Sequence, residues 1–259
     1  MQQDILLILI IILLGFLGAL LDSSLGMGYG LLTPILLALG LNPLTIVPVL
    51  LISQMTIGLS GTFFHSIYEN VDLSSTKTQD VKITIISILI GLASMTFAFF
   101  FIINVSELIL SIYISVLTIV AGILMFPKIE FGFSWKRMLL VSGWASFNKA
   151  VSGGGYGPIM TIGQMTTGRS ARQSVAVTDF SEAILAGFGF FLYFLCNLYC
   201  QFDFSAIIEL SLIMIISGIC ATPIGAFLTK KLEKKNAKGV IGISSIGIGI
   251  FSFIRLLLV

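Results

Sequence analysis

Long stretches of apolar residues are the feature that most restricts how this chain can fold. About 20 apolar residues in a helix cross a hydrocarbon core of about 30 Å, and unsatisfied backbone groups are too costly in lipid for irregular spans. Charged residues make up only 10% of the chain, far below the share of about 25% that is usual in soluble domains. The sequence therefore predicts an all-α polytopic membrane protein. The runs with almost no ionisable residue are 5–21, 83–103, 108–126, 206–228 and 239–254.

An internal repeat divides the chain into two parts. The segment GMGYG at 26–30 corresponds to GGGYG at 153–157, an offset of 127 residues. Because weak internal repeats of this kind are typical of secondary transporters, we expect two structural repeats, residues 1–127 and 128–259, in one transmembrane domain. The same offset pairs Asp22 with Lys149. After one inserted residue in the second half, Gln54 pairs with Glu182.

Each half begins with a hydrophobic segment that a glycine cluster interrupts. A glycine costs a helix about 1 kcal/mol, and Pro158 suits the first turn of a new helix. The arms that follow the breaks end near Gly40 and Gly168. With about 12 residues each, they reach roughly 18 Å, too short to cross a membrane. Each interrupted segment is therefore either one kinked span or a re-entrant hairpin.

The distribution of basic residues favours hairpins. With a hairpin and three full spans in each half, 12 of the 14 Lys and Arg residues fall on one side of the membrane. Three spans is an odd number, so the two halves are predicted to have opposite orientations, with both termini outside. The loops on the basic side are 66–82, 127–137, 168–172 and 229–238, and those on the other side are 40–44, 104–107 and 197–204.

Broken helices offer a place to bind an anion. The arm after each break begins with free backbone N–H groups and the positive end of the helix dipole, and glycine lets a ligand approach the backbone closely. Two such ends facing each other would bind an anion at mid-membrane. The alternative is that the glycines only allow close helix packing. The candidates for substrate binding are Ser23, Ser24, Gly28, Tyr29, Gly30, Lys149, Ser152, Gly154, Gly155, Tyr156 and Gly157.

Several ionisable residues lie within apolar segments, where a charge is expensive and usually functional. Lys149 is expected to pair with Asp22, to face the anion, or to extend its stem away from the core. Asp179 and Glu182 are three residues apart and share a helix face. The candidates for ion coupling are Asp22, Gln54, Asp179 and Glu182, with Asp179 also a candidate partner for Arg172. His65, the single histidine, is expected to be solvated or to cap a helix beside a polar loop.

Two motifs resemble the TauE/SafE sulfite-exporter family. The segment LGMGYGLLTP at 25–34 resembles the first repeat motif of that family, and VSGGGYGP at 151–158 resembles the second. The AVT segment at 176–178 and the two-part organisation are also similar. The chain departs from the family pattern at Tyr29 and Tyr156, which stand where a glycine is usual, and at Pro158, which comes early.

The resemblance implies export of sulfite or a small organosulfur anion across the plasma membrane, driven by an ion gradient. The residues by themselves support a small anionic substrate and a lipid environment, with an anion channel or a non-transporting structural protein as alternatives. No nucleotide-binding, metal-ligand or cofactor motif appears, so neither a cofactor nor an enzymatic activity is expected. No nucleic-acid motif appears either, and an oligomer remains open.

Overall fold

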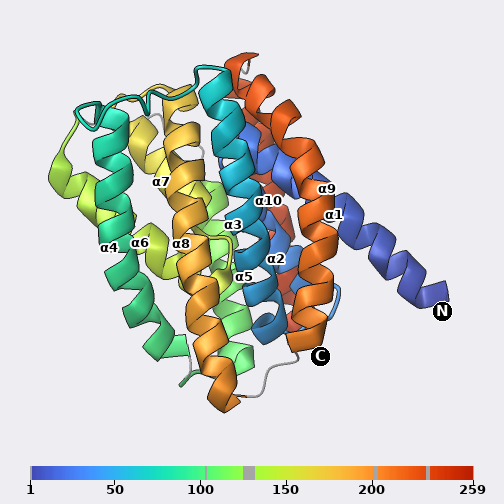
Figure 1. Ribbon diagram of the computed structural model, residues 1–259. Helices are drawn as coiled ribbons and strands as arrows, with labels where there is room; N and C mark the ends of the chain where they lie inside the picture. Colours follow the sequence, from blue (N-terminus) through green and yellow to red (C-terminus); the bar gives the residue numbers. More distant parts are fainter. Residues whose placement is uncertain (1, 103, 125–131, 201–203, 232–233, 259) are drawn as a thin grey trace.

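The computed structural model contains helices and connecting loops but no strand in the residues that it describes, which are 2–102, 104–124, 132–200, 204–231 and 234–258. The prediction of an all-α fold is confirmed. Helices α3, α4, α8 and α9 run side by side, and the tilted helix α1 packs against α9 and extends its N-terminal part out at one side (Figure 1). The helices are α1 (Gln2–Leu25), α2 (Gly28–Ala38), α3 (Pro43–Ile67), α4 (Gln79–Ile102), α5 (Glu107–Leu124), α6 (Trp135–Ser152), α7 (Tyr156–Thr166), α8 (Ala171–Cys200), α9 (Phe204–Lys231) and α10 (Lys234–Leu258).

Two helix breaks lie where the glycine clusters predicted them. Only Gly26 and Met27 separate α1 from α2, and only residues 153–155 separate α6 from α7. The first residue after each broken helix, Gly26 or Gly153, has a φ angle of +68° or +74°, in the left-handed region that favours glycine. The arms that follow, α2 and α7, have 11 residues each and are too short to cross a membrane alone.

Helix packing follows the same pattern in both halves. α1 packs against α9 as α6 packs against α4, and α3 packs against α9 as α8 packs against α4. Under the repeat, α3 corresponds to α8 and α5 to α10. The contacts of α3 with α8 and of α5 with α10 are therefore contacts between corresponding helices of the two halves. This is the contact pattern that a two-repeat chain would produce. The predicted boundary between 127 and 128 lies outside the described residues, and the inverted orientation stays a prediction.

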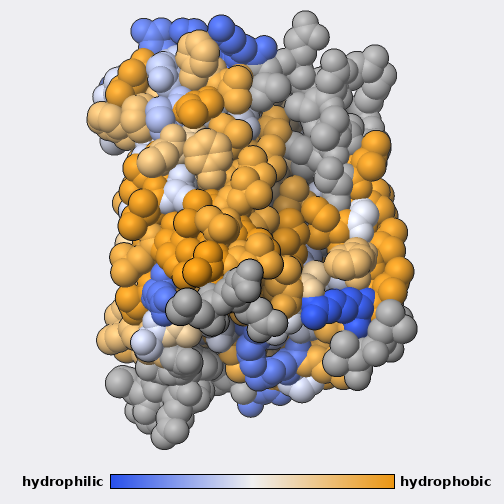
Figure 2. Space-filling model, turned by 90° about the vertical axis from the view of Figure 1, so that its right-hand side faces the viewer, coloured by the Kyte–Doolittle hydropathy of each residue, from blue (hydrophilic) through white to orange (hydrophobic). Residues whose placement is uncertain are grey.

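The ends of the bundle are polar and its middle is apolar. The connections from α3 to α4 and from α7 to α8 lie at one end, the top in Figure 1, and the C-terminus lies near the other. Figure 2 shows a broad hydrophobic band across one face, with hydrophilic residues mainly above and below it. Such a band matches a protein surrounded by lipid.

Among the described residues, five helices are long and apolar enough to cross a membrane, namely α1, α3, α4, α8 and α9. This set differs from the six full spans expected. α1 has 24 residues, so the first arm of the first hairpin could itself cross. The apolar segment of α5 is shorter, Glu107–Ile123, and the described apolar segment of α10 is Ser245–Leu256.

Candidate functional site

The two glycine breaks pack directly against each other. A Cβ atom on Gly30 would lie 3.0 Å from the carbonyl oxygen of Gly154, and one on Gly154 would lie 2.9 Å from the nitrogen of Gly30. Thr33 of α2 also donates a hydrogen bond of 2.7 Å to the carbonyl of Ser152. Segments 127 residues apart in sequence thus meet, with the backbones too close for side chains at these glycines.

Protein groups lie against the N–H donors at both breaks. The Ser152 hydroxyl accepts from the backbone N–H of Gly155 at 2.9 Å and of Gly154 at 3.4 Å. In the first half, the carboxyl group of Asp22 faces the backbone N–H groups of Gly28 and Tyr29. The partial positive charge at the start of α7 is therefore compensated by a hydroxyl group in this conformation, and that at the start of α2 by a carboxyl group.

A chain of four buried side chains crosses from one half to the other. Gln54 donates to the Asp22 carboxylate at 2.8 Å, and its amide oxygen accepts from the Lys149 ammonium group. Lys149 in turn forms an ion pair of 3.0 Å with Glu182. None of the four side chains is more than 2% exposed. These hydrogen bonds and the ion pair join Asp22 and Gln54 of the first repeat to Lys149 and Glu182 of the second. The alignment of the repeats had paired Asp22 with Lys149 and Gln54 with Glu182.

Lys149 has a different partner from the one considered first. The direct ion pair is with Glu182, and Gln54 stands between Lys149 and Asp22. The reason lies in the packing of α3 against α8, which brings Gln54 and Glu182 together at the last turn of α6. Extension of the lysine stem away from the core is wrong, because the side chain is fully buried.

The expectations for His65 and for the Asp179 partner were wrong. His65 is 0% exposed, and its Nε2 atom lies 3.6 Å from the Asp179 carboxylate. Arg172 instead donates to the backbone carbonyls of Tyr68 and Glu69. The cause is tertiary, because α3 and α8 pack together and place the end of α3 beside the third turn of α8.

The remaining predicted residues also lie near the breaks. Tyr29 and Tyr156 are both 0% exposed, and the Tyr156 hydroxyl is 2.8 Å from that of Ser181. The carbonyls of Ser23 and Ser24 accept from Thr229 of α9, at 2.7 and 3.2 Å. Gly157 packs against the first break, since a Cβ there would lie 3.1 Å from the carbonyl carbon of Gly26.

Three polar neighbours of the site were missed by the sequence analysis. Asn148 accepts a hydrogen bond from Tyr113, Ser181 contacts Tyr156, and Asn70 contacts His65 at 2.9 Å. Asn148 adjoins Lys149 in sequence, which offered a signal. Asn70 lies in a polar loop, where nothing in the sequence distinguishes it from its neighbours.

Hollows open at both ends of the bundle. One hollow lies at the end that holds the α3–α4 and α7–α8 connections, which the sequence analysis predicted to be the basic side and which is called the basic end below. It has a volume of about 640 Å³, and its walls include Glu69, Asn70 and Arg172. The hollow at the opposite end has about 380 Å³ and includes Glu107 and Arg255. In the described part of the chain, no group of three or more His, Cys, Asp or Glu side chains is placed to hold a metal ion.

Apolar helices, paired helix breaks and a buried charge chain between two halves together define a multi-pass membrane protein of the transporter class. The family model for the sulfite exporter TauE/SafE matches residues 11–252, nearly the whole chain. The chain therefore belongs to this family and is a multi-pass protein of the cell membrane. No curated protein and no solved structure matches it.

Proposed function

We propose that this protein is a secondary transporter that exports sulfite or a small organosulfur anion by alternating access. The observation that carries the proposal is the meeting of two glycine breaks, one from each half, beside the buried ammonium group of Lys149. Membership of the family supports the substrate class. The exchange of helix contacts between the halves supports two repeats that move relative to each other.

The substrate anion takes the place of protein groups at the breaks. In the described conformation Lys149 is neutralised by Glu182, and the Gly154 and Gly155 N–H groups are taken by the Ser152 hydroxyl. When the halves separate, an anion replaces Glu182 as the partner of Lys149 and accepts from the freed N–H groups. Charge-assisted bonds to Lys149 and to a helix N-terminus suit an oxyanion with several acceptor oxygens.

The two hollows support a path of access that begins at the basic end. The walls of the hollow at the basic end carry Glu69 and Asp72 as well as Arg172, so it is the basic residues of the surrounding loops that attract an anion, since cationic surfaces raise the local concentration of anions. Rocking of one half against the other closes this end and opens the hollow that contains Arg255. The closely packed breaks are then the point that separates the two sides.

Flux in proteoliposomes tests the proposal. Uptake of sulfite, sulfate, thiosulfate and ethanesulfonate is measured for the wild type, for Lys149→Ala and for Lys136→Ala, which removes an exposed lysine from the same helix. We expect saturable flux of at least one anion, lost in Lys149→Ala and retained in Lys136→Ala. Absence of flux from folded wild-type protein would refute the proposal, and flux that does not saturate would show a channel instead.

The glycine breaks need a separate variant. Gly155→Leu is expected to abolish flux, because a Cβ on Gly155 already lies 2.8 Å from the Ser152 hydroxyl and 2.9 Å from Leu117. Size-exclusion chromatography in detergent checks that the variant is folded. Normal transport by Gly155→Leu would place the anion elsewhere.

A further inference from the structure

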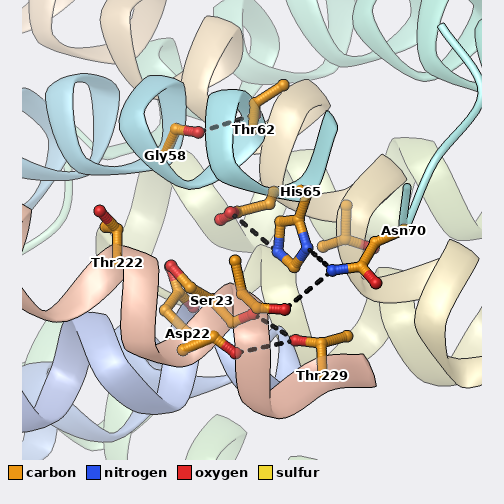
Figure 3. Close-up of polar contacts among 12 residues, drawn as sticks. Asp22, Ser23, Gly58, Thr62, His65, Asn70, Thr222 and Thr229 are labelled. Atoms are coloured by element: carbon orange, nitrogen blue, oxygen red, sulfur yellow. Dashed lines mark hydrogen bonds and ion pairs between the residues drawn. The ribbon is translucent and has the colours of Figure 1, made fainter. Parts of the chain in front are cut away.

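A second buried polar cluster lies between the substrate candidates and the hollow at the basic end. His65 comes from the last turn of α3, Asp179 from α8 and Ser23 from the last turn of α1. Figure 3 shows the His65 ring with Asn70 beside it and Ser23 nearby, and dashed lines reach both ring nitrogens. All four side chains are at most 2% exposed. The cluster thus connects both halves of the chain.

Polar atoms without partners converge in this cluster. Among the described residues, nothing hydrogen-bonds the Ser23 hydroxyl, His65 Nε2 or Asp179 Oδ2. The Ser23 carbonyl is near the His65 ring but short of hydrogen-bond geometry, and it accepts from Thr229 instead. Buried polar groups are nearly always satisfied, so three unpartnered atoms in one place mark a site that takes a small polar ligand or a proton.

Gly61 makes room for the Asp179 carboxyl group. A Cβ on Gly61 would lie 3.0 Å from the Ser23 hydroxyl and 3.3 Å from the carboxyl carbon of Asp179, and it would overlap one carboxylate oxygen. The carboxylate can therefore lie against the backbone of α3, directed toward His65. The gap of 3.6 Å between His65 and Asp179 is longer than a hydrogen bond but short enough for a proton transfer after a small shift.

The hydrogen bonds of Asn70 assign the tautomer of His65. The Asn70 side-chain amide nitrogen donates to the Ala226 carbonyl at 2.8 Å, so this nitrogen also faces His65 Nδ1 at 2.9 Å. Nδ1 is therefore the acceptor, and the ring proton is on Nε2, toward Asp179. A ring N–H beside the carboxylate would repel a metal cation. The cluster thus suits a proton rather than a sodium ion.

Asn70 also connects the cluster to water. It is 1% exposed, yet it lines the hollow of about 640 Å³ at the basic end. Its contact with Ala226 joins it to α9 in the second half, while His65 belongs to the first half. Movement of one half against the other would break the bond between Asn70 and Ala226, which frees the Asn70 amide to turn away from Nδ1 and open the ring to the hollow.

The charges around the cluster favour uptake of a proton. Three charged groups interact electrostatically with Asp179, namely Asp22 of α1, Glu182 of α8 and Lys149 of α6. Arg172 of α8 interacts in the same way with His65. Three buried carboxyl groups thus share one buried lysine. Because an unpaired buried charge is costly, at least one carboxyl group is more stable when protonated.

We propose that Asp179 and His65 form a proton-binding site that couples proton movement to anion transport, with protons entering past Asn70 from the basic end. This inference rests on the proposed function. A proton from the hollow binds His65 Nδ1 when Asn70 withdraws, and the Nε2 proton passes to Asp179 Oδ2. The ring returns to neutrality, and the added proton is on the carboxyl group, one turn of α8 from Glu182 and its pair with Lys149.

The test compares proton-driven flux in three variants. Asp179→Asn and His65→Gln keep polar side chains but cannot carry the proton. Asp80→Asn is the matched control, because Asp80 is a buried carboxylate whose partner is Arg169, outside the cluster. Proteoliposomes are loaded with whichever of the four sulfur anions the wild type transports fastest. The steady anion gradient is then measured against an imposed pH gradient, with protein-free vesicles as the blank.

One proton per anion predicts a roughly tenfold change in the anion gradient per pH unit for the wild type and for Asp80→Asn. In Asp179→Asn the gradient should no longer depend on pH, although anion exchange continues at a reduced rate. His65→Gln should slow proton-driven flux more than exchange. A pH dependence of wild-type size in Asp179→Asn would overturn the inference.

A second measurement does not depend on transport. Infrared difference spectra of the purified protein between pH 8 and pH 5 should show a protonated carboxyl band that is missing in Asp179→Asn and present in Asp80→Asn. If the wild type moves no anion but shows this band, the proposed function fails and the proton site stands. If the band persists in Asp179→Asn, the site is wrong even when transport is observed.

Discussion

Replacing Gly154 with alanine should force the two glycine breaks apart. A Cβ on Gly154 would lie 2.5 Å from the carbonyl carbon of Tyr29 and 2.9 Å from the nitrogen of Gly30. Carbon atoms in contact prefer about 3.5–4.0 Å, so the two backbones would have to separate by roughly 1 Å. Neighbouring side chains cannot absorb this, because the clashing atoms belong to the backbone.

The magnitude follows from measured overpacking. Extra methylene groups in a tightly packed core cost about 1–3 kcal/mol, and the rigid backbone contact places Gly154→Ala near the upper end. Gly143 provides a control on α6, since a Cβ there meets only Ile90, at 3.5 Å. Because alanine is the better helix former by about 1 kcal/mol, Gly143→Ala should be neutral or stabilising.

Unfolding in detergent measures this difference. The midpoint of thermal unfolding should fall for Gly154→Ala and stay level or rise for Gly143→Ala, with both proteins purified in the same way. Flux by Gly154→Ala should fall as well, because the breaks no longer close against each other. An unfolding midpoint for Gly154→Ala at or above that of the wild type would refute the close packing of the breaks.

Two further predictions concern the charges and caps around the breaks. Lys149→Met leaves Glu182 without its ion-pair partner and should destabilise the protein by about 3–5 kcal/mol, whereas adding Glu182→Leu should recover much of that loss, as a double-mutant cycle in detergent would show. Equal stability of the single and double variants would contradict the pairing. Ser152→Ala removes the acceptor for the Gly155 N–H and should cost about 1 kcal/mol. An unchanged unfolding midpoint in this variant would mean that water replaces the hydroxyl.

The buried carboxyl groups connect the two proposals. Lys149 is the shared partner of Glu182 and, through Gln54, of Asp22, while Asp179 lies one turn of α8 away from Glu182. An anion that draws Lys149 away from Glu182 leaves an excess of buried negative charge. Protonation of Asp179 offsets that excess, which gives a physical reason for substrate and proton to move in a coupled cycle.

The sequence by itself determined the fold class and the positions of the helix breaks. Apolar runs in a chain with few charges leave helices as the economical way to satisfy the backbone in lipid. The glycine clusters predicted breaks within 23–30 and 152–158, because glycine disfavours a helix, and the structure has them after Leu25 and Ser152, where Gly26 and Gly153 adopt the left-handed conformation. These are local properties, and the repeat made them visible twice.

Only the tertiary structure decided which buried groups are partners. The repeat pairs Asp22 with Lys149, yet the packing of α3 against α8 gives Lys149 to Glu182. The same packing buries His65 against Asp179, although its place at a helix end suggested contact with water. Side-chain pairing depends on contacts between helices far apart in sequence, and a helix pattern records which residues share a face but not which helix that face meets.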